Sequence, residues 1–164
     1  MTTDQSNKSK SKSIAPEELL NQYNIAREKG ERENFKKAWY FCNNQKDADE
    51  LADLTARGIK QATTSLYYWY EDGTEPMPKP GELNIITDYE GNPKCIIETV
   101  NVDVVAFKDV SEEFAHIEGE GDKSLAYWRN AHIRFFTEDM KAEGLSFTED
   151  MKVVCEVFRV VLVV

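Results

Sequence analysis

The stretch Asp47–Ser65, DADELADLTARGIKQATTS, decides the fold because it predicts a helix, the end of that helix and the start of a strand. Apolar side chains recur at helical spacing in its first half, which is typical of an amphipathic helix. Asp47 is a suitable N-cap, and Glu50 three residues later completes a capping-box pattern. Gly58 predicts the end of this helix, because glycine adopts the left-handed conformation at C′ without steric cost.

Lys60 and Thr63 come directly after the predicted helix end. At the mouth of a helix-to-strand turn, a lysine and a hydroxyl are placed for chemistry or for anion binding. The alternative is a solvated lysine followed by a threonine that starts a strand. This stretch alone favours the alternative, so a functional interpretation needs further residues elsewhere in the chain.

Length and charge narrow the functional classes. The chain has 164 residues, 41% of them hydrophobic and 30% charged, which is typical of one soluble domain with a real core. Its formal net charge is -10, and the first thirteen residues hold three lysines against Asp4, which leaves the remaining body at about -12. Such an acidic body repels a phosphate backbone. We therefore expect no long duplex nucleic acid as a partner, whereas a single nucleoside stays compatible.

The cysteines predict neither a disulfide framework nor a metal centre. Cys42, Cys95 and Cys155 are widely spaced, and no C-x-x-C pair is present. With no secretory hydrophobic region at the N-terminus, they indicate reduced thiols and a cytoplasmic protein. His116 and His132 add no metal-ligand spacing, so we expect no metal and no other cofactor.

No segment is suited to span a membrane. The apolar run at residues 153–164 has only twelve residues, and Glu156 and Arg159 interrupt it. It instead predicts a closing strand, apolar at nearly every position, in the centre of a sheet.

Periodicity and turn residues predict a series of helices and strands. The first half reads as a disordered tail, a helix from Pro16 to about Gly30, a second helical piece carrying Phe35, Ala38, Trp39 and Cys42, a strand over Thr63–Tyr70, and a proline-rich loop. The second half reads as a strand over Leu83–Asp88, a long strand or strand pair over Lys94–Phe107, a short helix capped by Asp109 or Ser111, a longer helix from Ser124 to Gly144, and the closing strand over Met151–Val163. This order predicts an α+β fold.

Few residues are suited to catalysis. The chain has no G-x-S-x-G, H-E-x-x-H or phosphate-binding G-K-[ST] motif, which leaves Lys60, Thr63 and the acids Glu118, Glu120 and Asp122. A lysine acts as a base if burial lowers its pKa, a threonine attacks once a base takes its proton, and a carboxylic acid can protonate a leaving nitrogen. Together they form an acyl-transfer set. The alternative is a plain ion pair between Lys60 and Glu118.

Two motifs carry a resemblance to a known family. The segment GIKQAT at residues 58–63 resembles the G-x-K-x-x-T/S signature of ASCH-domain proteins, and EGEGDKSLAYWR at residues 118–129 resembles the E-G-E-G-D-x-S-x-x-x-W-R block of one bacterial branch. The resemblance extends over about Trp39 to Val160. It implies a small, partly open PUA-like β-barrel surrounded by helices. We therefore expect a disordered tail at residues 1–13, an N-terminal helical extension at 14–46 and an ASCH domain at 47–164.

The same resemblance implies a function. Some small ASCH proteins are amidohydrolases acting on acetylated cytidine through a lysine, a threonine and a glutamate, which fall here on Lys60, Thr63 and Glu118. The neighbouring residues expected to bind the ligand are Gly58, Ser65, Glu120, Asp122 and Arg129. Other family members are RNA-binding or ribonucleolytic, so a non-catalytic module for short RNA or a modified nucleotide is the alternative. The expected partner is accordingly a small nucleoside-like ligand or short RNA.

Two structural expectations follow. Lys60, Thr63 and Glu118 should meet in one cleft, and since positions 60 and 63 of a regular strand face opposite sides, they should lie in a turn or bulge. A third functional class, an interaction protein, would instead expose a large apolar patch over residues 19–39.

Overall fold

The computed structural model describes residues 14–26 and 35–164 of the chain. In this part of the chain, one sheet contains five strands: β1 (Phe35–Trp39), β2 (Ala62–Leu66), β3 (Leu83–Thr87), β4 (Pro93–Ala106) and β5 (Lys152–Val163). The helices are α1 (Pro16–Ala26), α2 (Gln45–Ala56), α3 (Glu112–Glu118) and α4 (Leu125–Ala142), with short 3-10 turns at Tyr67–Tyr70 and Phe107–Asp109.

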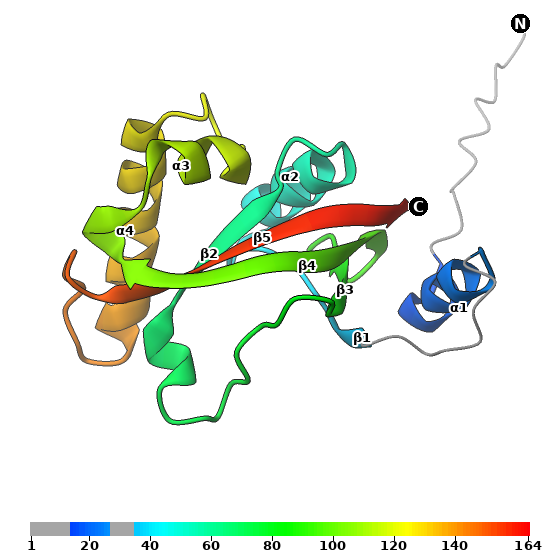
Figure 1. The fold of residues 1–164 in the computed structure, drawn as a ribbon, viewed down its shortest axis with the longest axis horizontal. Coiled ribbons are helices and arrows are strands. Elements are labelled where there is room, and N and C mark those ends of the chain that lie inside the picture. Colours follow the sequence, from blue (N-terminus) through cyan, green and yellow to red (C-terminus); the bar gives the residue numbers. More distant parts are fainter. Residues whose placement is uncertain (1–13, 27–34) are drawn as a thin grey trace, which may run out of the picture.

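The strands lie in the order β1-β3-β4-β5-β2, with β1 parallel to β3 and every other pair antiparallel. The sheet curls into a half-barrel with helices around it, which confirms the predicted α+β fold with a partly open PUA-like barrel (Figure 1). In the described residues, no helix is long and apolar enough to cross a membrane.

Apolar packing attaches each helix to the sheet. Trp128, Phe136 and Met140 of α4 pack with Leu66 and Val153 of the sheet. Around α2, Ala52 packs with Ile86, Ile97 and Phe158. Helix α4 therefore packs on β2 and β5, and α2 packs on β3, β4 and β5.

Helix α1 also contributes its apolar face to the core. Leu19 and Tyr23 are 1% and 5% exposed, packed with Leu83, Ile85 and Ile96. The interaction hypothesis requires the apolar side chains of this segment at the surface, so burial of these two residues weakens it. The tail predicted at residues 1–13 and the helix end near Gly30 lie outside the described residues.

The predicted second helical piece is wrong, because Phe35–Trp39 is the strand β1. Its backbone pairs with β3, Trp39 lying opposite Ile86, and the Trp39 indole donates a hydrogen bond to Asn84 (3.1 Å). The spacing of apolar residues suited a helix, but pairing with a strand more than forty residues away overrides so short a pattern. The division into an extension at 14–46 and a domain at 47–164 stays a prediction.

Two boundaries also differ from prediction. The N-cap of helix α2 lies three residues before the expected one: it is Asn44, whose side-chain oxygen accepts from the Asp47 amide (2.9 Å), while its side-chain amide donates to the Asp47 carboxylate (2.8 Å). The strand expected over Thr63–Tyr70 ends at Leu66, and Tyr67–Tyr70 forms a 3-10 turn. That turn ends the predicted alternation of aromatic faces.

The other element predictions are confirmed. Ser111 and Ser124 cap α3 and α4 by accepting hydrogen bonds from the amides of Phe114 and Tyr127. Strand β5 lies between β4 and β2, as its nearly continuous apolar run predicted.

Candidate functional site

Lys60 reaches the site because the chain turns sharply after α2. Gly58 has φ +73°, and the amides of Ile59 and Lys60 both donate to the Leu54 carbonyl (2.9 and 3.1 Å). The next amide, Gln61 N–H, donates to the carbonyl of Ile117 in α3 (3.0 Å). Lys60 therefore stands at a junction between α2, β2 and α3, and its side chain is only 1% exposed.

Glu118 is brought beside Lys60 by the end of α3. Gly119 caps this helix with φ +74°, and its Cα lies against the backbone of Ile59 and Lys60. Any side chain at position 119 would separate the two segments. This contact places the last residue of α3, Glu118, in the interior, where it is 1% exposed.

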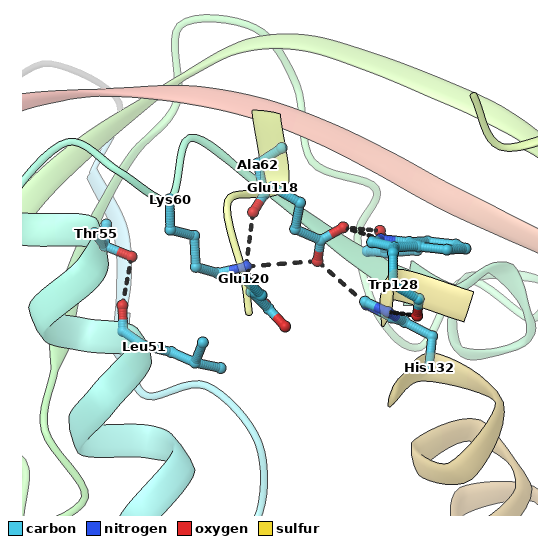
Figure 2. Close-up of polar contacts among 9 residues, drawn as sticks. Leu51, Thr55, Lys60, Ala62, Glu118, Glu120, Trp128 and His132 are labelled. Carbon is cyan, nitrogen blue, oxygen red and sulfur yellow. Dashed lines mark hydrogen bonds and ion pairs between the residues drawn. The ribbon is translucent and has the colours of Figure 1, made fainter. Parts of the chain in front are cut away.

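The Glu118 carboxylate is the centre of the polar cluster (Figure 2). Oε1 is 3.5 Å from Lys60 Nζ and 3.2 Å from His132 Nε2. Oε2 accepts from the Thr64 hydroxyl at 2.7 Å and from the Trp128 indole N–H at 2.5 Å. A buried carboxylate with four such partners is fully compensated for the loss of water.

The Lys60 ammonium makes two further contacts. It donates to the carbonyl of Ala62 at 2.8 Å and to Glu120 Oε1 at 2.6 Å. Glu120 follows Gly119 and is 17% exposed at its side chain. Lys60 thus joins two carboxylates, one fully buried and one at the edge of solvent.

His132 is the second basic side chain of the cluster. Its Nδ1 is 2.8 Å from the Trp128 carbonyl oxygen, which only accepts, so Nδ1 carries a proton. Its Nε2 faces the Glu118 carboxylate and donates to it when the ring is protonated. Burial lowers the pKa of His132, but the charge and hydrogen bond of Glu118 outweigh burial and raise it.

The same balance fixes the other charges. Burial would raise the pKa of Glu118, but Lys60 and His132 hold it at about 2. Burial would lower the pKa of Lys60, but Glu120 and Glu118 outweigh burial and raise it. Lys60 is therefore held as the charged ammonium, because it has two carboxylate partners.

A cavity of about 340 Å³ adjoins this cluster, between α2, α4 and the start of β2. Glu118, Glu120 and His132 line it together with aromatic side chains from two segments: Phe41 before α2, and Tyr127 and Phe135 of α4. The remaining charged lining residues are Asp47, Glu50, Glu138 and Arg134. Acidic groups thus outnumber basic ones around a space of the size of a small ligand.

Thr63 and Thr64 both line the cavity, but only Thr64 touches the cluster. Both lie in the regular strand β2, where Thr63 is opposite Glu156 and Thr64 is opposite Cys155. Since successive side chains of a strand point to opposite faces, the two hydroxyls point in different directions. The turn or bulge expected to hold both Lys60 and Thr63 is found only for Lys60, which follows the turn after α2, whereas Thr63 lies in the regular strand β2. The hydroxyl that reaches Glu118 is that of Thr64.

The other predicted ligand-binding residues lie away from the cavity, apart from Glu120. Gly58 ends α2, and Ser65 shares a hydrogen bond with the Tyr70 hydroxyl (2.9 Å). Asp122 accepts from the Ser124 amide (2.8 Å) ahead of α4. Arg129 pairs with Glu149 and lies over the ring of Phe107.

Cys42 lines the cavity but is a poor nucleophile. Burial, followed by the nearby Glu120 and Asp47 charges, raises its pKa to about 11, so the thiol is protonated at neutral pH. All three cysteines are free. Within residues 14–26 and 35–164, no group of three His, Cys, Asp or Glu side chains is placed to hold a metal ion.

Comparison with known proteins agrees with this architecture. The family profile described as "ASCH domain" matches residues 37–162. The chain belongs to the ASCH-domain family. It is similar to the solved ASCH domain from Lactobacillus crispatus JV V101, at 41% identity and a TM-score of 0.80, over 89% of this chain and 93% of that one. No curated protein matches at a significant level.

A second solved structure is also similar to this ASCH domain. It is a protein from Enterococcus faecalis V583, with 32% identity and a TM-score of 0.79. The alignment covers 90% of this chain and 93% of that one. The fold of this ASCH domain is therefore shared along almost the whole length of both relatives.

Sequence reasoning missed three members of the cluster in this ASCH domain. Trp128 and His132 were not among the predicted site residues, yet they are four residues apart on α4 and present one face to Glu118. That spacing was the available signal. No such signal in the sequence pointed to Thr64, because the choice between adjacent threonines depends on strand register.

Proposed function

We propose that this ASCH domain is an amidohydrolase that acts on a small, uncharged, acylated nucleoside resembling acetylated cytidine. The observation that supports it best is the buried Glu118 carboxylate at the cavity wall, shared by Lys60 and a threonine hydroxyl at 3.5 and 2.7 Å. A base, an acid and a nucleophile thus lie within one cluster, as acyl transfer from an amide requires.

The protons held by Lys60 and Glu118 suit this chemistry. Lys60 and Glu118 form an ion pair at rest, and transfer of one proton within the pair yields neutral Lys60 and protonated Glu118. The threonine oxygen attacks the acyl carbon while its proton passes to Lys60, through the Glu118 carboxyl that both groups contact. Glu118 protonates the departing amine as the C–N bond breaks. Water then cleaves the acyl ester, and the carboxylic acid leaves with the ion pair restored.

The family signature and the hydrogen bonds point to different threonines as the nucleophile. The ASCH signature gives Thr63, whereas the hydrogen bond to Glu118 favours Thr64. We assign the attack to Thr64, because within the described residues it is the threonine hydroxyl bonded to the reactive pair. Thr63 shapes the cavity beside it.

The acidic lining favours a ligand without phosphate. Asp47, Glu50 and Glu138 face the cavity, with Arg134 as the basic residue at its rim. Such a lining repels the phosphates of nucleotides and RNA, whereas an uncharged nucleoside can pack its base against Tyr127 or Phe135. We also propose a cytoplasmic location, which the three free cysteines support.

The experiment incubates the full chain with N-acylated nucleosides, acetylated cytidine first, and measures released nucleoside by chromatography. We expect turnover in the wild type and none in Lys60→Ala. Lys60→Arg should be equally inactive, because a guanidinium keeps the charge but cannot act as a base. Lys94→Ala, at a partly exposed lysine paired with Asp88, is the matched control. A folded wild type that hydrolyses none of the panel would refute the amidohydrolase.

The second candidate is a binding module without turnover. The observation that favours it is the charge state of the ligand-free cluster, in which Lys60 is held protonated and Glu118 ionised. Calorimetric titration with unacylated nucleosides and short RNA tests it. Saturable binding without turnover would select this candidate, and binding of RNA that weakens steeply with salt would identify phosphate contacts.

A further inference from the structure

Within the described residues, every N–H group of the Lys60 ammonium has an acceptor. Its three N–H groups face three oxygens, those of the Ala62 carbonyl, Glu120 and Glu118, at 2.8, 2.6 and 3.5 Å. A ligand oxygen can therefore bind to this ammonium only if one of the three protein oxygens leaves.

The three acceptors differ in how firmly they are held. The Ala62 carbonyl belongs to the backbone of β2, whose residues pair with β5. Glu118 is held by hydrogen bonds from Thr64, Trp128 and His132 as well as by Lys60. Within the described residues, the Glu120 carboxylate has Lys60 as its one hydrogen-bond partner. Glu120 is thus the acceptor that can leave with the smallest loss.

Glu120 is also the acceptor placed at the cavity with access to solvent. It lines the cavity and its side chain is 17% exposed, against 1% for Lys60 and Glu118. Its backbone is fixed on both sides, by Gly119 against Ile59 and by the Glu120 carbonyl, which accepts from the Lys123 amide (2.9 Å). Rotation of the Glu120 side chain therefore suffices to uncover the ammonium, without movement of the loop.

We propose that Glu120 is an internal competitor of the ligand, occupying the position on the Lys60 ammonium that a ligand carbonyl or carboxylate oxygen takes. The identity of the natural ligand rests on the proposed function, but the contact itself does not. When Glu120 leaves, the strongest influence that raises the pKa of Lys60 is removed, while Glu118 still raises it. Entry of the ligand would thus leave Lys60 paired with Glu118, the pair within which the proposed proton transfer takes place.

The test uses acetate and formate, two small carboxylates that can replace the missing side chain. In Glu120→Ala, the vacated position on Lys60 should bind either anion saturably. The indole N–H resonance of Trp128, which donates to Glu118, reports this binding by NMR. We expect the acetate midpoint of Glu120→Ala to be at least about tenfold lower than that of the wild type, because the wild-type site is already filled.

Two variants make the result specific. Asp150→Ala removes an exposed acid that does not line the cavity and changes the net charge equally, so it should resemble the wild type. Lys60→Met combined with Glu120→Ala should abolish acetate binding. Acetate binding in Asp150→Ala equal to that in Glu120→Ala, or no saturable shift in a folded Glu120→Ala, would overturn the proposal. If Glu120→Ala does not fold, Glu120→Ser replaces it, because it removes the carboxylate and shortens the side chain, and an acetate midpoint equal to the wild type overturns the proposal there.

The acetate-binding test can succeed or fail independently of the hydrolysis assay. Acetate binding requires no turnover, so it can occur even if no acylated nucleoside is hydrolysed. Conversely, hydrolysis by the wild type combined with no acetate binding in Glu120→Ala would leave the amidohydrolase standing and remove only the competitor.

Discussion

The Cα of Gly119 lies so close to the Ile59 carbonyl that a Cβ at position 119 would be 2.2 Å from that oxygen. This contact sets the distance between the end of α3 and the turn before β2, and thereby the distance between Glu118 and Lys60. We predict that Gly119→Ala lowers the free energy of unfolding by about 2–4 kcal/mol, through left-handed strain and overpacking against backbone. Urea denaturation measures it.

Gly144→Ala is the matched control, because Gly144 has φ +72° and no neighbouring atom within 4 Å of an added Cβ. Only the conformational cost of about 1–2 kcal/mol remains there. Equal losses in the two variants would show that the close approach of α3 contributes nothing beyond backbone conformation.

Removal of the charge on Glu118 should destabilise the whole chain. Glu118→Gln keeps the shape but leaves Lys60 and His132 buried without their shared carboxylate. We expect a loss of about 3 kcal/mol in urea denaturation at neutral pH. Glu98→Gln, which removes a carboxylate from the exposed pair with Arg159, should cost at most about 1 kcal/mol. A small loss in Glu118→Gln would mean that its two cations are neutral in the folded chain.

His132 should make stability depend on pH. Its pKa is raised in the folded chain, where Glu118 and Glu120 face it and Trp128 accepts from Nδ1. Its contribution is therefore fully present below the unfolded pKa of about 6.5 and is lost as pH rises through the folded pKa. In the wild type, the unfolding free energy should therefore decrease as pH rises from 6 upward. We predict that this decrease is absent in His132→Gln. Because His116 is exposed, His116→Gln should keep the wild-type slope.

The two adjacent threonines should differ in turnover of an acylated nucleoside. Thr64→Val should lower the catalytic rate by at least about a hundredfold, because it removes the hydroxyl bonded to Glu118. Thr64→Ser should retain part of it, and Thr63→Val most of it. Chromatographic assays of the four proteins, each checked for folding by circular dichroism, decide the matter. An inactive Thr63→Val beside an active Thr64→Val would return the role to Thr63.

Local signals predicted much of this fold. Gly58, Ser111 and Ser124 act within a few residues of themselves, so the helix boundaries that they set were readable from the chain. The convergence of Lys60 and Glu118 was also predicted, from the two motifs together, and the structure confirms it at 3.5 Å.

What failed depends on partners distant in sequence. β1 exists because β3 offers it a parallel edge, and Phe35–Trp39 alone carries no sign of that partner. The choice between Thr63 and Thr64 depends on register with β5, where one residue exchanges the two faces. The charge of Lys60 depends on two carboxylates rather than one, which spacing alone did not reveal.

Because Lys60 is buried, the rate at which its amine is labelled covalently should report how often the folded chain opens. Amine-acylating reagents need a neutral, accessible amine, whereas Lys60 is 1% exposed and bonded on three sides. The other lysines of the described segments are exposed or partly exposed and should react at once. The rate at which an added mass appears on the peptide containing Lys60 would therefore measure the rate at which the folded chain opens.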